Sequence, residues 1–269
     1  MKPARSLLPL VVLSLFAAGT SASAAPALPA TGNLVLELTF DGEPLPNMAL
    51  IKPAGSSAEL LTRFGTGIGG GPRSRAFDNI AASDAMGGNK ERPGKGGRVS
   101  INEGFEPLKG ARSFTIQGWY RSAPGMLPSN YARLLSTPRV SLLFDNTEGR
   151  GLALSVNRGS ALSNDGAFRH ADRWVFFAVS YDGTGEADNV TFYVGGEKEP
   201  VRLVARTSIA SGPVGAPNSR DPLILGNTPE GDRPFAGLID NIRIWADRSG
   251  GGAVLSSTEL EQVRAFDLR

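Results

Sequence analysis

The sequence predicts an all-β fold in which two antiparallel sheets pack face to face as a jelly-roll sandwich, followed by one short C-terminal helix. Three observations support this prediction. Short apolar segments that alternate with polar residues recur along the chain. Prolines and Asp-Gly or Gly-Gly dipeptides separate these segments, as expected for turns. Long helical patterns do not alternate with the strand patterns, which argues against parallel βαβ units.

The N-terminal residues have the features of an export signal. Lys2 and Arg5 form a basic start, residues 7–18 are mostly apolar, and Ala22-Ser23-Ala24 has the spacing of a cleavage site. We therefore predict a signal peptide over residues 1–24 and export to the periplasm or the cell exterior. The apolar run is shorter than the roughly 20 residues that span a bilayer, so we expect no membrane insertion of the mature chain.

The mature chain is predicted to contain a flexible Ala/Pro-rich leader over residues 25–32 and one jelly-roll domain over residues 33–269. The full sequence has 28 basic and 26 acidic residues, and two of the basic ones lie in the predicted signal. The mature protein is thus formally neutral, and its charge does not suggest a nucleic-acid partner. The sequence contains no cysteine, which excludes disulfides and thiolate chemistry.

The strand pattern extends along almost the whole mature chain. We expect strands over residues 34–40, 48–52, 99–101, 113–121, 133–136, 140–144, 151–156, 174–181, 190–194, 201–205, 223–226 and 235–245. The segment 174–181 is almost entirely apolar, which indicates a central strand that is covered on both faces. Ser256 and Glu259 form a capping box that opens the only convincing helix, over residues 260–266.

Residues 65–97 differ from the rest of the domain because they are rich in glycine, with lysine and arginine between the glycines. We interpret this segment as a long glycine-rich loop excursion on the surface. It does not end in the Gly-Lys-Ser/Thr sequence of a phosphate-binding loop, so we do not predict nucleotide binding.

The strand at residues 235–245 carries an unusual carboxylate. Strict alternation places Leu238, Ile242 and Ile244 on one face, together with Asp240. The opposite face would carry Ile239, Asn241, Arg243 and Trp245. A carboxylate on a core face is costly unless it is hydrogen-bonded, paired or bound to a metal. Asp240 is therefore the first residue to consider for function.

Three sequence motifs occur in an order that resembles a known family. They are residues 113–119 (SFTIQGW), residues 173–183 with 190–196, and residues 223–226 with 237–245 and 255–260. This set is similar to the laminin-G-like, concanavalin A-like jelly rolls of secreted bacterial proteins, and the resemblance covers residues 33–269. It implies two curved antiparallel sheets and a short helix that closes the domain.

The resemblance also implies a structural calcium ion. Domains of this type often bind calcium through an aspartate that opens a late strand and through oxygens at the end of the first strand. Asp240 matches that aspartate, and Asp41, in the Phe40-Asp41-Gly42 turn, matches the partner. Calcium prefers six to eight hard oxygen ligands, many of which can be backbone carbonyls. The alternative is that Asp240 pairs with an arginine or accepts hydrogen bonds from backbone amides without a metal.

The sequence does not contain an assembled catalytic set. Family 16 glycoside hydrolases share the implied architecture and carry two catalytic glutamates in a Glu-x-Asp-x-x-Glu run on one strand, and this run is absent. His170 is the only histidine and lies in a predicted surface loop, without a Gly-x-Ser-x-Gly motif elsewhere. We therefore predict no catalytic residues and do not expect an enzyme.

Exposed aromatic residues would offer a surface for sugar rings, and Trp119 and Tyr120 are the predicted ligand-binding residues. The alternative is that both are buried in the sandwich. The sequence thus predicts a secreted, non-catalytic module that binds a glycan or an extracellular protein surface and contains a structural calcium ion. Two alternatives are a glycosidase or polysaccharide lyase on the same scaffold and a structural or assembly protein of the cell envelope.

Overall fold

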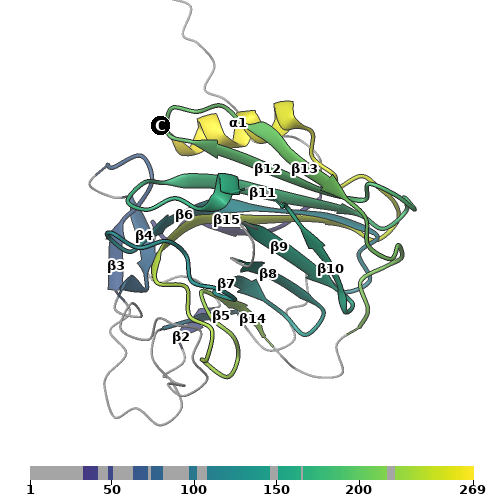
Figure 1. Cartoon of the computed structure of the whole chain (residues 1–269), viewed down its shortest axis with the longest axis horizontal. Helices are drawn as coiled ribbons and strands as arrows, with labels where there is room; N and C mark the ends of the chain where they lie inside the picture. Colours follow the sequence, from purple (N-terminus) through teal and green to yellow (C-terminus); the bar gives the residue numbers. More distant parts are fainter. Residues whose placement is uncertain are drawn as a thin grey trace, which may run out of the picture.

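Two antiparallel sheets form the protein (Figure 1). A computed structural model describes residues 33–41, 48–50, 63–71, 74–80, 97–101, 108–145, 151–164, 166–216 and 222–269. The predicted signal peptide and leader lie outside the described residues. No helix in the described part of the chain is long and apolar enough to cross a membrane.

The two sheets contain eight and seven strands within the described residues. The eight-stranded sheet has the spatial order β13 (Arg202–Thr207), β12 (Val190–Gly196), β11 (Val175–Asp182), β6 (Ser113–Ser122), β15 (Gly237–Asp247), β4 (Arg75–Asp78) and β3 (Arg63–Thr66), and β1 (Leu34–Leu38) also pairs with β15. The seven-stranded sheet has the order β10 (Gly159–Leu162), β9 (Leu152–Val156), β8 (Val140–Phe144), β7 (Arg133–Ser136), β14 (Leu223–Leu225), β5 (Val99–Ile101) and β2 (Met48–Leu50). A short 3₁₀ helix, η3 (Gly166–Phe168), precedes β11, and the helix α1 (Ser257–Asp267) follows β15. The predicted all-β sandwich with one C-terminal helix is confirmed.

The main core lies between the two sheets and is built by the predicted alternation. In β6, Phe114, Ile116 and Tyr120 belong to this core, whereas Trp119 belongs to a second cluster on the other face of the sheet. A fully buried apolar side chain of this size contributes roughly 1.5–3 kcal/mol to stability. The intersheet cluster therefore supplies most of the hydrophobic stabilisation of the fold.

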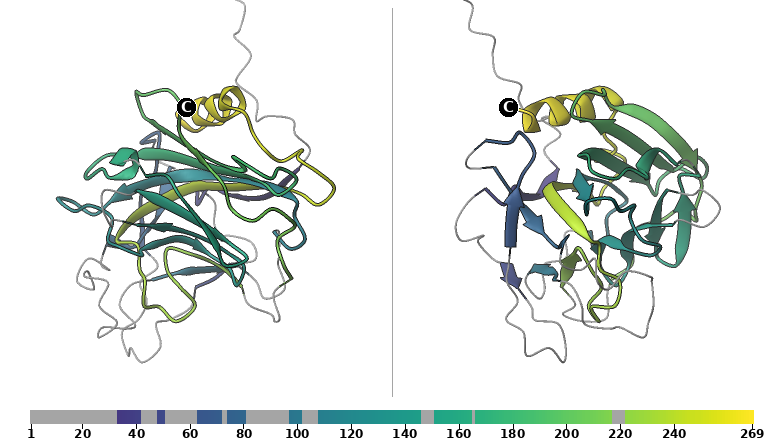
Figure 2. Two further views of the ribbon diagram at one scale, coloured as in Figure 1. Left: turned by 45° about the vertical axis from the view of Figure 1, so that its right-hand side comes forward. Right: turned by 60° about the vertical axis from the view of Figure 1, so that its left-hand side comes forward.

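The helix α1 covers the outer face of the eight-stranded sheet (Figures 1 and 2). Its residues Leu260 and Val263 pack in the second cluster with Phe176 of β11 and Trp245 of β15. This cover explains why β11 is apolar on both faces, as the sequence predicted. The predicted capping box is present, because the side chains of Ser256 and Glu259 each accept a hydrogen bond from the backbone N–H of the other.

The first strand and the last strand of the sequence lie side by side. Strand β1 pairs antiparallel with β15, with Leu38 opposite Ile242 and Leu36 opposite Ile244. The first and last strands of the described residues therefore lie in one sheet. This pairing brings Asp41, just beyond β1, to the level of the middle of β15.

The predicted face assignment along β15 is wrong in one half of the strand. Ile239 and Ile242 both belong to the intersheet core, although strict alternation would place them on opposite faces. The register with β6 shifts between Asp240 and Arg243, and Asn241 has a positive φ of 47°. A β-bulge of this kind adds one residue and exchanges the faces of everything that follows. Leu238 thus belongs to the cluster under α1, as does Trp245 after the bulge.

The interpretation of residues 65–97 as a surface loop is wrong where this segment forms strands, at residues 65–66 of β3 and in β4. Strands β3 and β4 form a hairpin there that extends the eight-stranded sheet. Gly69 and Gly70 adopt φ of 86° and 64°, so glycine allows the chain to turn tightly here. Phe77 of β4 is buried in the main core. Residues 81–96 lie outside the described part of the chain.

Candidate functional site

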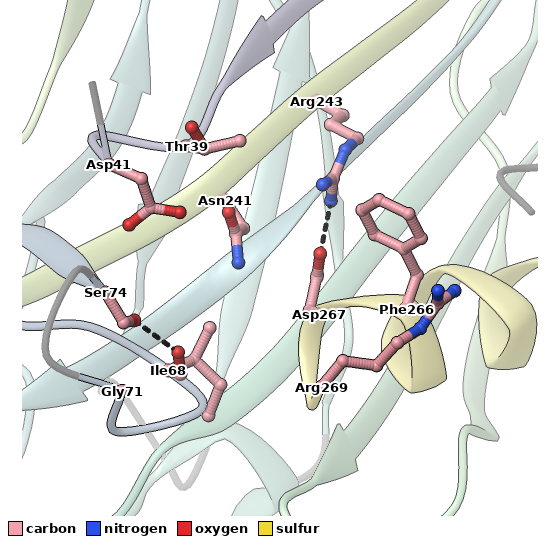
Figure 3. Close-up of a pocket in the computed structure, with 10 residues that line it drawn as sticks. All are labelled: Thr39, Asp41, Ile68, Gly71, Ser74, Asn241, Arg243, Phe266, Asp267 and Arg269. Atoms are coloured by element: carbon pink, nitrogen blue, oxygen red, sulfur yellow. Dashed lines mark hydrogen bonds and ion pairs between the residues drawn. The ribbon is translucent and has the colours of Figure 1, made fainter. Parts of the chain in front are cut away.

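A cavity of about 390 Å³ opens beside the bulge in β15 (Figure 3). Its walls come from four parts of the chain: the residues after β1, the β3–β4 turn, β15 and the C-terminal end of α1. The lining residues are Thr39, Asp41, Ile68, Gly71, Ser74, Asn241, Arg243, Phe266, Asp267 and Arg269. Figure 3 shows Asp41 and Ser74 on one side of the cavity, Arg243 and Asp267 on the other, and Asn241 between them.

A buried ion pair forms one wall of this cavity. Arg243 Nη1 donates to Asp267 Oδ1 at 2.8 Å, and both side chains are at most 1% exposed. Arg243 Nε also donates to Glu37 Oε1 at 2.8 Å, and Trp119 Nε1 donates to Asp267 Oδ2 at 2.8 Å. Burial raises the pKa of Asp267 to about 6, against the opposing effects of Arg243 and Trp119. Both carboxylate oxygens of Asp267 are therefore occupied by structural contacts.

An aromatic ring lies beside this ion pair. The guanidinium carbon of Arg243 lies 5.5 Å from the centroid of the Phe266 ring, and that of Arg269 lies 4.6 Å from it. Such contacts attract a cation to an aromatic face. They hold the last turn of α1 against β15 and thereby shape the cavity.

Asp240 precedes the cavity residue Asn241 in β15 and is only 1% exposed. Its Oδ2 accepts a hydrogen bond from the Ile68 backbone N–H at 2.8 Å, and its Oδ1 accepts one from the Asn241 N–H at 2.7 Å. Burial raises the pKa of Asp240 to about 8, the two backbone hydrogen bonds oppose this change, and Asp41 and Asp267 add to it by repulsion. Within the described residues, no cationic side chain contacts this carboxyl group.

Asp41 and Asp240 come together as the sequence predicted. Asp41 is exposed, and its Oδ1 accepts a hydrogen bond from the Arg75 backbone N–H at 2.8 Å. The β3–β4 turn passes close to both carboxylates: a Cβ atom on Gly67 would lie 2.5 Å from Asp240 Oδ2 and 2.7 Å from the Arg75 carbonyl oxygen. Only glycine therefore fits at residue 67, against the Asp240 carboxylate and the backbone of Arg75.

These residues fit a hard cation. A buried carboxyl group beside a second carboxylate, without a cationic partner in the described residues, is the environment that calcium would stabilise. The described residues do not bring together three or more Asp, Glu or His side chains that could hold a metal by themselves. Calcium at Asp41 and Asp240 would therefore need carbonyl oxygens or water for its remaining ligands.

The predicted ligand-binding residues Trp119 and Tyr120 are both completely buried, so the prediction that they contact a ligand is wrong. Trp119 lies under α1 and donates its hydrogen bond to Asp267. Tyr120 points into the main core, where its hydroxyl donates to the Phe168 carbonyl oxygen. The reason is that both faces of β6 are covered, one by the second sheet and the other by α1.

His170 lies at a second cavity, of about 310 Å³, together with Arg173, Glu199 and Arg202. Arg173 Nη2 lies 2.7 Å from His170 Nε2. Because arginine only donates, Nε2 accepts and the proton of a neutral ring is on Nδ1. Burial and the neighbouring Arg173 lower the pKa of His170. No hydroxyl group of the described residues donates to this ring, so the arrangement is not a nucleophile–base pair.

Sequence reasoning missed Arg243 and Asp267 as site residues. Arg243 lies among apolar residues in a buried strand, which indicates that it needs an anionic partner. Asp267 lies in the last turn of a helix, where the helix dipole disfavours a negative charge. An arginine in an apolar strand and an aspartate at a helix C-terminus are thus the two features of the sequence that could have indicated the site. Neither feature shows that the two residues pair with each other.

The sequence matches a family model over residues 93–249, the Laminin_G_3 family of the concanavalin A-like lectin/glucanases superfamily. The protein therefore belongs to this family, in agreement with the predicted resemblance. No curated protein matches the sequence.

Solved structures show the same fold. Domain 4 of AbnA, an extracellular GH43 arabinanase from Geobacillus stearothermophilus solved in complex with arabinotriose, aligns with a TM-score of 0.54 and 15% identity over 86% of this chain and 98% of that domain. The binding domain of botulinum neurotoxin DC, solved in complex with rat synaptotagmin II, aligns with a TM-score of 0.50 and 9% identity over 87% of this chain. The alignment spans about half of the neurotoxin structure, 51%. At sequence identities of 15% and 9%, these alignments show a shared fold and do not show a shared ligand.

Proposed function

We propose that the protein is an exported, non-catalytic glycan-binding module that contains a structural calcium ion. The main support is that the carboxyl groups with raised pKa values are engaged in structural contacts. Asp267 binds Arg243 and Trp119, and Asp240 accepts two backbone hydrogen bonds. Neither group is left to act as a general acid or base toward a substrate.

The family and the fold support the glycan as the ligand. The family description names lectins and glucanases, and the domain of the arabinanase that shares the fold was solved with a bound arabinotriose. Because one fold can carry many different binding sites, a binding measurement identifies the ligand. The direct experiment is a glycan array with the purified protein without residues 1–24. Binding to one group of saccharides is expected; an array and a pull-down that both find no ligand would contradict the proposal.

The proposed calcium ion would be held by Asp41 and Asp240. It would neutralise the buried carboxylate and join the end of β1, the β3–β4 turn and the bulge of β15. A ligand that binds only the folded state stabilises it, by about 2.7 kcal/mol at 100 times its Kd. We expect a higher midpoint of thermal unfolding in calcium than in chelator, and the Asp240→Asn variant should not show this difference. Equal midpoints for the unmodified protein would contradict the calcium site.

An enzyme on the same scaffold is the second candidate. The specific observation that favours it is that two carboxyl groups, those of Asp41 and Asp267, both line the cavity beside β15, although Arg243 and Trp119 already donate to Asp267. Retaining and inverting glycosidases use two carboxyl groups about 5–9 Å apart. Release of reducing sugars from polysaccharides that bind the protein, with its loss in both Asp41→Asn and Asp267→Asn, would support this alternative over a binding module.

A further inference from the structure

Loops from three parts of the sequence meet at one end of the sandwich. The loop between β6 and β7 contacts the loop before β11, because the Gly125 N–H donates to Asp172 Oδ1 at 2.9 Å. The first residue of β7 contacts the β14–β15 loop, because the Arg133 N–H donates to the Arg233 carbonyl oxygen at 3.1 Å. Binding residues of rigid β-sandwiches are often carried by such loops.

Tyr131 lies at this end and is unusual in two ways. It is 43% exposed, which makes it one of the most exposed large hydrophobic residues described. Its backbone has a positive φ of 62°, which is rare for a bulky residue that is not glycine or asparagine. Two hydrogen bonds hold it there: its N–H donates to the Phe144 carbonyl oxygen at 2.7 Å, and its carbonyl oxygen accepts from Arg133 Nη1 at 2.8 Å. Backbone conformations of this kind cluster at functional sites.

Two arginines lie close to Tyr131, Arg233 at its ring and Arg133 at its backbone carbonyl. The guanidinium carbon of Arg233 lies 5.4 Å from the centroid of the Tyr131 ring. Arg133 Nε is buried and has no hydrogen-bond partner in the described part of the chain. Burial and the like charge of Arg233 lower the pKa of Arg133, and Asp232 only partly opposes this. The two positive charges are thus close enough to repel each other.

One carboxylate lies beside this pair. Asp232 lies 3.9 Å from Arg233, and its Oδ1 also accepts a hydrogen bond from the Thr228 hydroxyl at 2.5 Å. Asp232 is therefore shared between the Arg233 guanidinium group and the Thr228 hydroxyl. We call Tyr131, Arg133, Asp232 and Arg233 the Tyr131 rim.

We propose that the Tyr131 rim binds an acidic saccharide. The exposed aromatic ring would pack against the apolar face of a sugar, and the guanidinium groups of Arg133 and Arg233 would bind its carboxylate or sulfate. The combination of an aromatic ring with paired arginines selects a ligand that is both a sugar and an anion. This inference rests on the proposed glycan-binding function and adds the site and the class of saccharide.

The test uses saccharides that differ only in charge. Oligogalacturonate is compared with its methyl ester, and dextran sulfate with dextran, by calorimetric titration of the protein without residues 1–24. We expect binding of at least one charged member and at least tenfold weaker binding of its neutral counterpart. Affinity should also fall as salt is added, because the ligand is held partly by charge. The two pairs distinguish a carboxylate from a sulfate as the recognised group.

Variants locate the site. Tyr131→Gly removes the ring and permits the positive φ, and Arg233→Gln removes one guanidinium group, so both should weaken binding at least tenfold. Phe64→Ala is the matched control, because Phe64 is also an exposed ring (38%) with an arginine, Arg75, whose guanidinium carbon lies 6.0 Å from its centroid. Its binding should be unchanged, as should that of Arg206→Gln on the edge strand β13. Unfolding midpoints show whether each variant is folded.

Several results would overturn the inference. Equal affinity for charged and neutral saccharides, or unchanged affinity in both rim variants, would mean that the protein binds glycans at a site other than the Tyr131 rim. Loss of binding in Arg173→Gln instead would place the site at the His170 cavity. Equally strong binding of double-stranded DNA would indicate non-specific attraction of anions. If the protein binds none of these saccharides and no saccharide on a broad array, the proposed function is overturned as well.

Discussion

The cavity beside β15 and the Tyr131 rim share one backbone feature, but their charged groups have opposite signs. Each lies next to a residue other than glycine with a positive φ, Asn241 in one case and Tyr131 in the other. In the cavity the buried charged groups include carboxyl groups, and burial raises the pKa values of Asp240 and Asp267. At the rim they include guanidinium groups, and burial lowers the pKa of Arg133. We therefore propose a cation as the ligand of one region and an anion as the ligand of the other.

The difference in burial shows which region is structural. The carboxyl groups of Asp240 and Asp267 are almost completely buried. Asp240 accepts hydrogen bonds from backbone amides and Asp267 accepts them from Arg243 and Trp119, so both groups are expected to affect stability. The rim exposes its aromatic ring, so its residues are expected to affect binding with little change in stability. The following variants test this contrast, in order of decreasing effect.

The largest loss of stability is expected for Arg243→Ala. The change leaves the Asp267 carboxylate buried without its cation, which typically costs about 3–5 kcal/mol. Arg173→Ala is the matched control, because the Arg173–Glu199 pair is 46% and 58% exposed and should contribute less than about 1 kcal/mol. Urea unfolding of both variants measures the difference. Similar losses would show that the ion pair at the cavity is not a main structural contact.

A pH dependence is expected from Asp240 in chelator. The carboxyl group ionises near pH 4 in the unfolded chain but near pH 8 in the folded one, so the unfolded state binds fewer protons in this window. Stability is therefore full below about pH 4 and falls as the pH rises to 8, by a few kcal/mol, since each pKa unit corresponds to about 1.4 kcal/mol.

The Asp240→Asn variant should lack this fall in the free energy of unfolding with rising pH. Saturating calcium should make the fall smaller, because calcium stabilises the ionised carboxylate. Glu186→Gln, which changes an exposed carboxylate in the β11–β12 loop, should leave the decline unchanged. Unfolding free energies at pH 5, 6, 7 and 8 provide the measurement. If Asp240→Asn declines as steeply as the unmodified protein, Asp240 is not the group responsible.

Trp119→Phe is expected to cost less, about 1–3 kcal/mol. It removes the hydrogen bond from the indole N–H to buried Asp267. Trp245→Phe is the matched control, because Trp245 is equally buried and its Nε1 has no partner in the described residues. The Trp119 variant should be the less stable of the two, and neither should alter glycan affinity. A specific loss of glycan affinity in Trp119→Phe would restore the predicted contact role.

The smallest effect on stability is expected for Tyr131→Gly. Glycine adopts a positive φ without the cost of about 1–2 kcal/mol that other residues incur, which offsets the added freedom of the unfolded chain. Stability should be unchanged or raised by up to about 1 kcal/mol. Leu127→Gly, at an equally exposed residue (43%) of the same loop without a positive φ, should lower it. A loss larger than that of Leu127→Gly would show that the Tyr131 ring is mainly structural.

The fold could be predicted from local patterns because each strand carries its own signal. The alternation in β6, the apolar run of β11 and the capping box of α1 are all confirmed, since side-chain period and capping depend on neighbouring residues. The β3–β4 hairpin was missed because its glycines suggest a loop, and they in fact form the tight turn between two strands.

The site was only partly predictable. The sequence by itself determined the family, the sandwich and the proximity of Asp41 to Asp240, because the pairing of the first and last strands is a property of the fold. The tertiary structure alone decided that Trp119 and Tyr120 are buried, that Arg243 meets Asp267, and that Tyr131 is exposed. The physical reason is that a bulge, a helix packed on a sheet and the meeting of distant loops set the surroundings of a side chain, and these depend on contacts between residues far apart in the sequence.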